Sequence, residues 1–315
     1  MTYEGNIGTE GRTEELAALL DEAVPEFEAA SHDLALYAAA QAATEIANMR
    51  VLMDQGLEAV ERSQAYARRA GMLEVSRDWD TSFRFLGSIP LDRFVVWLDE
   101  RNAISPKQLA YKARALAGLG RFDEARQLLA EATAKLADQG ARMRLAGTLS
   151  LDAVAIELLA GDPAAAVEYG EQGCRLFEES GERGFLSTSA GMLAQAYEAL
   201  ERLREAEEWA ERARDLGTSD DVITQALWRQ VKAKVCAARG AHDEGERLAR
   251  EAVSILDASE MLEGQASAYA DLGEVLRRGE KDPTPALEEA LARYERKGNL
   301  VMAARMRERL VEVPP

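Results

Sequence analysis

The chain has 315 residues, of which 38 are basic and 56 acidic, so its formal net charge at pH 7 is −18. This charge excludes general binding to nucleic acid or to anionic membranes, because phosphate contacts need a basic surface. The longest apolar run, Leu34 to Ala40, is too short to span a bilayer, and the polar start shows no signal peptide. We therefore expect a cytoplasmic protein.

The N-terminal part predicts a disordered tail at residues 1–12, followed by three helices. Thr13 is suited to cap a first helix from Glu14 to about Val24, which Pro25 should end. A second helix should run from residue 31 to about 53. A third should return from residue 56 to 70 and end at a glycine.

The next hairpin, residues 73 to about 102, is rich in aromatic residues and turns at Gly87 to Pro90. Its aromatic residues are Trp79, Phe83, Phe85, Phe94 and Trp97. They form either a ligand-binding shelf or the bulky core of an irregular junction.

From Pro106 the pattern becomes regular. It predicts helices at about 106–119, 122–138, 141–160, 163–179, 184–200, 203–216, 220–239, 242–258, 261–278 and 284–297. The proline-containing segment 279–285 should be a linker. A final helix, residues 300–311, should cover the open end with Leu300, Ala303, Ala304 and Leu310.

A stripe of small or medium residues recurs in the second helix of each pair. It stands at Ala125, Leu129 and Ala132, and again at Gly56, Val60, Ser63; Ala166, Gly170, Gly173; Ala206, Ala210, Ala213; and Gly245, Ala249, Ala252. The turns before these helices, at Gly120, Gly161, Glu201 and Gly240, are about 40 residues apart. This period predicts a stack of helix pairs in which each pair contacts only its neighbours.

The turn Leu119 to Ala125 and the small residue at the eighth position of the first helix (Ala113, Ala194, Ala233) resemble the longer variety of tetratricopeptide repeat. The resemblance implies an all-α fold: a right-handed superhelical solenoid of antiparallel helix pairs, with residues 13–312 as one domain. Pro163, Leu203 and His242 depart from the family, because they stand where Phe122 supplies its usual aromatic residue.

Three passages, residues 159–163, 220–228 and 294–299, resemble the C-terminal repeat region of actinobacterial regulators. Those proteins join a nucleotide-cyclase or LuxR-type output domain to a signal-transducing ATPase and then to repeats. The resemblance implies a regulatory role in signal transduction. Neither the ATPase nor the output domain occurs in this sequence.

The sequence contains no recognisable catalytic pattern. No GxxxxGK[ST] phosphate loop occurs, and His32 and His242 are isolated from other metal ligands. Cys174 and Cys236 lack CxxC spacing and are expected to be buried free thiols. We therefore expect no enzymatic activity, no metal and no cofactor.

Three classes of function remain. We favour a binding or scaffold module whose concave groove holds a peptide, a protein segment or a small anionic metabolite. The alternatives are a structural or oligomerisation module and, more remotely, a regulatory fragment that acts in trans with a cyclase or ATPase partner.

The resemblance places groove-facing side chains at the second, fifth, ninth and twelfth positions of each first helix. This frame selects Arg77, Arg84, Lys107, Arg114, Gln195, Gln230, Lys234 and Arg277 as the candidate site, and only Thr148, Leu151, Ala155 and Leu158 from the helix at 141–160. Basic residues outnumber acidic ones in the frame, which predicts an anionic ligand. Alternatively, these bases pair with neighbouring acids.

Overall fold

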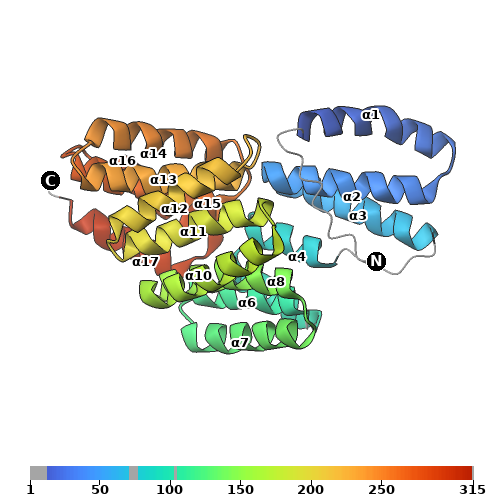
Figure 1. Cartoon of the computed structure of the whole chain (residues 1–315), viewed down its shortest axis with the longest axis horizontal. Coiled ribbons are helices and arrows are strands. Elements are labelled where there is room, and N and C mark those ends of the chain that lie inside the picture. Colours follow the sequence, from blue (N-terminus) through green and yellow to red (C-terminus); the bar gives the residue numbers. More distant parts are fainter. Residues whose placement is uncertain (1–12, 71–76, 103–104, 314–315) are drawn as a thin grey trace.

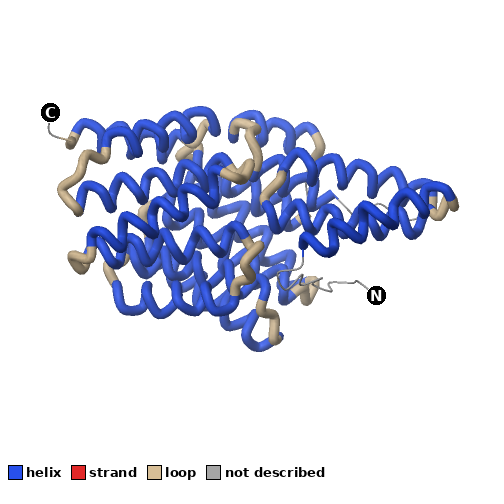
Figure 2. The backbone as a smooth tube through the Cα atoms, turned by 90° about the horizontal axis from the view of Figure 1, so that it is seen from above, coloured by secondary structure: helices blue, strands red, loops and turns tan. Residues whose placement is uncertain are grey.

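The computed structural model describes residues 13–70, 77–102 and 105–313, and every regular element in this part is a helix (Figure 2). In chain order they are α1 (Thr13–Ala29), α2 (Asp33–Arg50), α3 (Met53–Arg69), α4 (Arg77–Leu86), α5 (Leu91–Glu100), α6 (Pro106–Gly118), α7 (Phe122–Asp138), α8 (Arg142–Gly147), the π-helical η1 (Thr148–Ala153), α9 (Val154–Ala160), α10 (Pro163–Ser180), α11 (Gly184–Ala199), α12 (Leu203–Leu216), α13 (Val222–Ala238), α14 (His242–Asp257), α15 (Leu262–Arg278), α16 (Thr284–Lys297) and α17 (Leu300–Val311). The tail predicted at 1–12 lies outside the described residues.

Successive helices pair as the repeat spacing predicts, with α6 against α7, α11 against α12, α13 against α14 and α15 against α16. The turns use the residues that the sequence indicated: Gly120 and Gly240 have φ of 81° and 82°, a left-handed conformation that glycine adopts without steric cost. Ser105 accepts a hydrogen bond from the Gln108 N–H, and Gln108 returns one to the Ser105 N–H, forming a capping box at α6.

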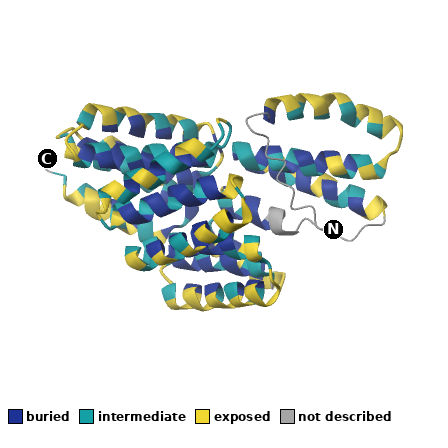
Figure 3. Cartoon of the chain, in the orientation of Figure 1, coloured by how far each residue is buried: buried dark blue, intermediate teal, exposed yellow. Residues whose placement is uncertain are grey.

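The stripe of small residues is buried between the helices of each pair. Ala125 and Ala132 of α7 and Ala206 of α12 have no exposed surface. A Cβ atom at Gly173 of α10 would lie 2.7 Å from the carbonyl oxygen of Ala146, so the backbones touch at this point. The face opposite the stripe is exposed, as Figure 3 shows in yellow for α7.

The superhelix closes on itself, contrary to the expectation that only neighbouring pairs touch. Figure 1 shows α1, α2 and α3 projecting from a body that the other helices form. Within the body α17 contacts α6, and Arg305 of α17 donates a 2.7 Å hydrogen bond to the carbonyl oxygen of Leu159. Near the projecting helices, the Glu260 N–H donates to the Val51 carbonyl at 3.0 Å. The rotation from pair to pair therefore brings distant repeats together.

The first three helices correct two predicted boundaries. α1 does not end at Pro25 but continues to Ala29. Val24 and Phe27, on either side of the proline, are both half-buried. Packing of α1 against α2 therefore stabilises the helix past the proline. The turn after α2 comes at Val51, earlier than predicted. Val51 has φ of 55° and is fully buried, so α3 begins at Met53 and not near Gly56.

The final helix also differs from its prediction. Ala303 and Met306 are buried in the cluster that ends the stack, and Leu310 packs at its edge. Leu300 is 59% exposed and Ala304 is exposed as well. The apolar face of α17 is therefore rotated from the predicted one, because residues of α17 also face α6.

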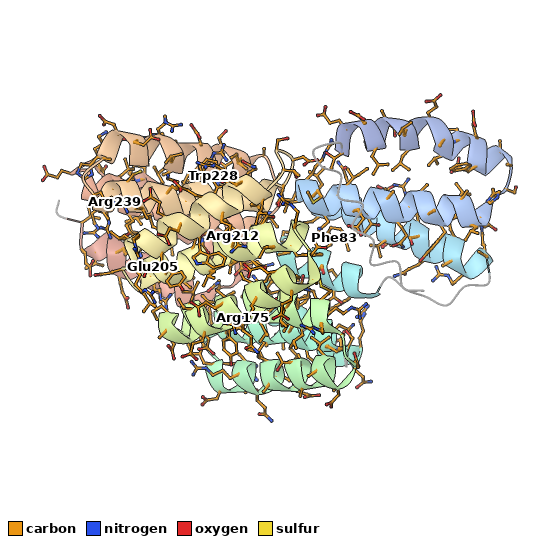
Figure 4. All side chains as sticks on the ribbon, viewed as in Figure 1. Phe83, Arg175, Glu205, Arg212, Trp228 and Arg239 are labelled. Carbon is orange, nitrogen blue, oxygen red and sulfur yellow. The ribbon has the colours of Figure 1, made fainter. Side chains whose placement is uncertain are left out.

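Of the two predicted alternatives for the aromatic hairpin, the core junction holds for Phe83, Phe85 and Phe94, while Trp97 is half-buried. Phe83, Phe85 and Phe94 are almost fully buried, and the Phe94 ring stacks on Trp97 at 5.9 Å between centroids. Phe83 lies where the projecting helices meet the body (Figure 4). The side chain of Trp79 lies outside the described part.

Candidate binding site on the inner face

The first helices of successive pairs line the inside of the superhelix, and polar side chains connect them in register. Ser150 of η1 hydrogen-bonds Ser189 of α11 at 2.7 Å, and Thr188 of α11 hydrogen-bonds Thr224 of α13 at 2.8 Å. Each of these pairs is one repeat apart in sequence. The inner face is therefore a continuous polar ladder.

One end of this ladder is basic and surrounds Asp152 of η1, which is 1% exposed. Arg114 Nη1 lies 3.4 Å from Asp152 Oδ1, and Lys107 Nζ lies 3.9 Å from Oδ2, an oxygen that receives no hydrogen bond. Arg114 stacks over the Phe85 ring at 4.8 Å and Lys107 over the Tyr111 ring at 4.3 Å. The aromatic rings thus fix two cations that share one carboxylate.

Lys107 stays charged in this setting. Burial alone would lower the pKa of its ammonium, but the neighbouring Tyr111 and Asp152 outweigh that effect and the pKa is raised. Its side chain is 34% exposed and that of Arg114 is 22% exposed. These two cations, which we call the rim pair, therefore reach solvent at the edge of the inner face.

The other end of the ladder is acidic and centred on Lys234 of α13. This ammonium pairs with Glu198 of α11 and lies 3.3 Å from Asp271 of α15. Gln230 donates a 2.9 Å hydrogen bond to Asp271. Burial, opposed by Lys234 and reinforced by Glu274, raises the pKa of Asp271 to about 6. The four charged side chains are between 11% and 15% exposed, so this end is sealed.

Comparison with known proteins agrees with this architecture. A chain in the crystal structure of the APC/C hetero-tetramer Cut9–Hcn1 aligns over 87% of this chain and 55% of its own length, with a TM-score of 0.57 and 12% identity. The fold is a tetratricopeptide-like helical-repeat solenoid. BtubC (BKLC) from P. vanneervenii aligns with a TM-score of 0.42 and 17% identity, over 84% of this chain and 94% of its own.

A third similar structure is a putative kinesin light chain of Podosopora anserina with nearly identical TPR-like repeats. It has a TM-score of 0.39 and 18% identity, and the alignment covers 66% of this chain and 97% of that one. No protein-family model and no curated protein sequence matches the chain. At 12% identity, the Cut9–Hcn1 chain shows the fold of this solenoid and nothing about its ligand.

The eight predicted groove residues do not lie together in the solenoid. Lys107, Arg114, Gln230 and Lys234 belong to the ladder just described. Gln195 of α11 is half-buried, Arg277 of α15 is exposed at the end of its helix, and Arg84 stacks over Trp97 at 5.2 Å. Arg77 begins α4, but its side chain lies outside the described part.

Asp152 and Asp271 are inner residues that the sequence frame missed, and Lys297 at the end of α16 is a buried charge that the frame did not cover. In the helix 142–160 the frame selected Leu151, but the π-helical turn inserts an extra residue and brings Asp152 to the inner face. Asp152 and Asp271 offset the predicted excess of positive charge, because each pairs with a predicted cation. Asp152 could have been recognised from the sequence, because it is an isolated aspartate in the mostly apolar run that follows Leu149.

The outer surface offers shallower features. One hollow of about 300 Å³ follows α5 and is lined by Asp92, Arg93, Val96, Trp97 and Glu100. Another of about 520 Å³ lies at the tip of the projecting helices, beside Tyr66 and Arg69. Elsewhere the outer helices carry ion pairs, including Arg212 with Glu178, Arg239 with Glu207 and Glu205 with Arg202, each at 2.6 Å (Figure 4).

The two cysteines are free, as predicted. Cys174 is buried and burial raises the pKa of its thiol to about 12, so it is not a thiolate nucleophile at neutral pH; Cys236 is only half-buried.

Across the described residues, no group of three or more His, Cys, Asp or Glu side chains is arranged to hold a metal ion. In the same part, no helix is long and apolar enough to cross a membrane.

Proposed function

We propose that the protein is a non-catalytic, regulatory helical-repeat scaffold that binds an acidic segment of a protein partner at the rim pair, Lys107 and Arg114. The observation that carries the proposal is the sharing of Asp152 by two partly exposed cations at 3.9 and 3.4 Å. A lysine ammonium has three donors and a guanidinium has five, so the Asp152 carboxylate and the Tyr111 hydroxyl leave donors of both cations free for a ligand. A cytoplasmic location fits this role.

The fold supports a role in protein assembly. The Cut9–Hcn1 structure is a hetero-tetramer, so a solenoid of this kind occurs in a complex with a second protein. A small anionic metabolite would use the same donors. The resemblance to actinobacterial regulators favours a signalling context, and the alternative partner that it suggests is an ATPase or cyclase acting in trans.

A titration with a fluorescein-labelled hexaglutamate peptide tests the proposal, with fluorescence anisotropy as the readout and citrate and phosphate as competitors. We expect saturable binding that weakens with salt. D152N removes the internal carboxylate that competes for the rim pair, so it should tighten binding. R114Q/D152N removes both partners of the ion pair together and should weaken binding roughly tenfold or more relative to D152N, because a charge-assisted hydrogen bond is lost.

The outer-face variant R212Q is the matched control, because Arg212 pairs with Glu178 far from the rim pair. It should bind as the unaltered protein does. Equal affinity of D152N, R114Q/D152N and R212Q would place the acidic segment elsewhere, and no binding at all would reject the site. Citrate displacing the peptide at low concentration would assign the same donors to a small metabolite. Concentration-dependent dimers in sedimentation, together with no binding, would favour the oligomerisation alternative.

A further inference from the structure

One of the contacts that close the superhelix lies where the turn between α16 and α17 meets the turn between α4 and α5. We call this contact the seam: residues 297–299 on one side and residues 85–91 on the other. Lys297 Nζ donates hydrogen bonds to the carbonyl oxygens of Phe85 and Gly87, the latter at 2.6 Å. Gly298, with φ of 73°, brings its backbone close to the Leu91 backbone nitrogen. These residues are about 210 positions apart in the chain.

The seam is polar, unlike the interfaces between successive repeats. The hydrophobic cluster around Phe85, Phe94 and Leu116 contains no residue of α16 or α17, and the cluster around Tyr294 and Met306 contains none from α4 to α6. Burial of apolar surface supplies most of the stability of a helical stack. The direct contact between the two turns of the seam is therefore polar, while beside it Phe83 and Leu86 of α4 share an apolar cluster with Val222, Ile223 and Met261 of the later repeats.

Lys297 makes the seam unusual in a second way. It has no exposed surface, and both of its hydrogen-bond acceptors are backbone carbonyls and not carboxylates. The charged groups that face it or its turn are Glu263 of α15, Arg114 of α6 and Asp92 of α5. The carbonyls at the end of α4 favour a cation, but removal from water disfavours it.

We propose that the seam is a gate, which opens while the flanking repeats remain folded and in which the buried Lys297 amine works against closure at neutral pH. An open gate would expose the sealed inner face around Lys234 and Asp271 to a partner. Binding of a partner through the open gate rests on the proposed function, whereas the opening of the seam does not.

The gate has a defined pH dependence. Burial lowers the pKa of Lys297 to about 8, with Glu263 acting in the opposite direction and Arg114 in the same one. The closed form therefore binds the proton less tightly than the open form, in which the lysine would have its ordinary pKa near 10.5. Closure is weakest below pH 8 and strengthens as pH rises toward 10.5. Between pH 6.5 and 9.5 the fraction open should fall roughly 30-fold.

Hydrogen–deuterium exchange of the full chain tests the gate, after correction for the intrinsic pH dependence of exchange. We expect amides of residues 86–92 and 298–303 to be less protected at pH 6.5 than those of α11 and α13. Their protection should rise roughly 30-fold by pH 9.5. K297M keeps an unbranched side chain that is one atom shorter and removes the charge, so it should be more protected at pH 6.5 and show no such rise. K281M changes an exposed lysine and is the matched control.

Two results would overturn the gate. One is exchange of the seam amides at the rate of the α11 and α13 amides, which would mean that the seam opens only on global unfolding. The other is the same pH profile in K297M as in the unaltered protein. If K297M does not fold, a flat profile of the unaltered protein is itself decisive against the gate. No partner is present in the experiment, so its failure is distinguishable from failure of the rim-pair proposal.

Discussion

Replacing Gly173 with alanine tests whether the small-residue stripe is what allows helices to pack so closely. Gly173 lies in α10, and a Cβ atom there would be 2.6 Å from the Ser150 Cβ, 2.7 Å from the Ala146 carbonyl oxygen and 2.8 Å from the Ser150 backbone nitrogen. Two of these three atoms belong to the backbone and cannot rotate away. Ser150 is also held by its bond to Ser189.

The size of the effect follows from two opposing contributions. Alanine favours a helix over glycine by about 1 kcal/mol, and overpacking of a tight interior costs about 1–3 kcal/mol or more. Because backbone atoms are in the way, we take the upper part of that range and expect G173A to lose about 2 kcal/mol net. Gly147 is the matched control: it is helical, and its added Cβ would meet nothing nearer than Phe177 at 3.8 Å.

Urea unfolding followed by circular dichroism at 222 nm measures both variants. G147A should be more stable than the unaltered protein by up to about 1 kcal/mol, because it gains helix propensity without a clash. G173A should have the lower midpoint of the two by a wide margin. If G173A is as stable as G147A, close backbone packing at the stripe does not determine the geometry of the pair, and the reasoning is wrong.

Two further predictions concern the acidic end of the ladder. K234M should lower the free energy of unfolding by about 3 kcal/mol in a urea titration, since Glu198 and Asp271 would lose their buried counter-ion; an unchanged midpoint would refute the pairing. D271N tests the raised pKa of Asp271, which means that the folded protein holds the carboxyl proton more tightly than the unfolded chain. The stability of the unaltered protein relative to D271N should therefore increase as pH falls from 7 through 6 to 4, and a constant difference would contradict this.

Local sequence signals predicted most of the helix pairs. The stripe residues and the turn glycines recur at a fixed spacing, and both are properties of single repeats. Two caps seen in the structure were not part of that prediction: Ser105 caps α6, and Asn299 caps α17 by accepting from the Met302 N–H at 3.0 Å. The pairing of successive helices was therefore predicted correctly, whereas the end of α1, the turn at Val51 and the π-helical turn at 148–153 were not.

Closure of the superhelix could not be predicted in the same way. It depends on the sum of small rotations between successive pairs, and no single residue encodes that sum. The burial of Lys297 follows from closure, so the sequence alone gave a lysine at a helix end with no sign of its surroundings. The π-helical turn displaced the groove frame by one residue and thus exchanged Leu151 for Asp152.

Quantitative acetylation of the seven lysines, read out by mass spectrometry at short reaction times, tests most directly whether the inner face is sealed except at the rim pair. Lys281 and Lys135, with side chains 48% and 38% exposed, should react fastest, followed by Lys107 at 34%. Lys234 and Lys297 should be protected, although the lowered pKa of Lys297 would make its amine the more reactive one if it were exposed. Modification of Lys234 and Lys297 as fast as Lys281 would contradict a closed solenoid.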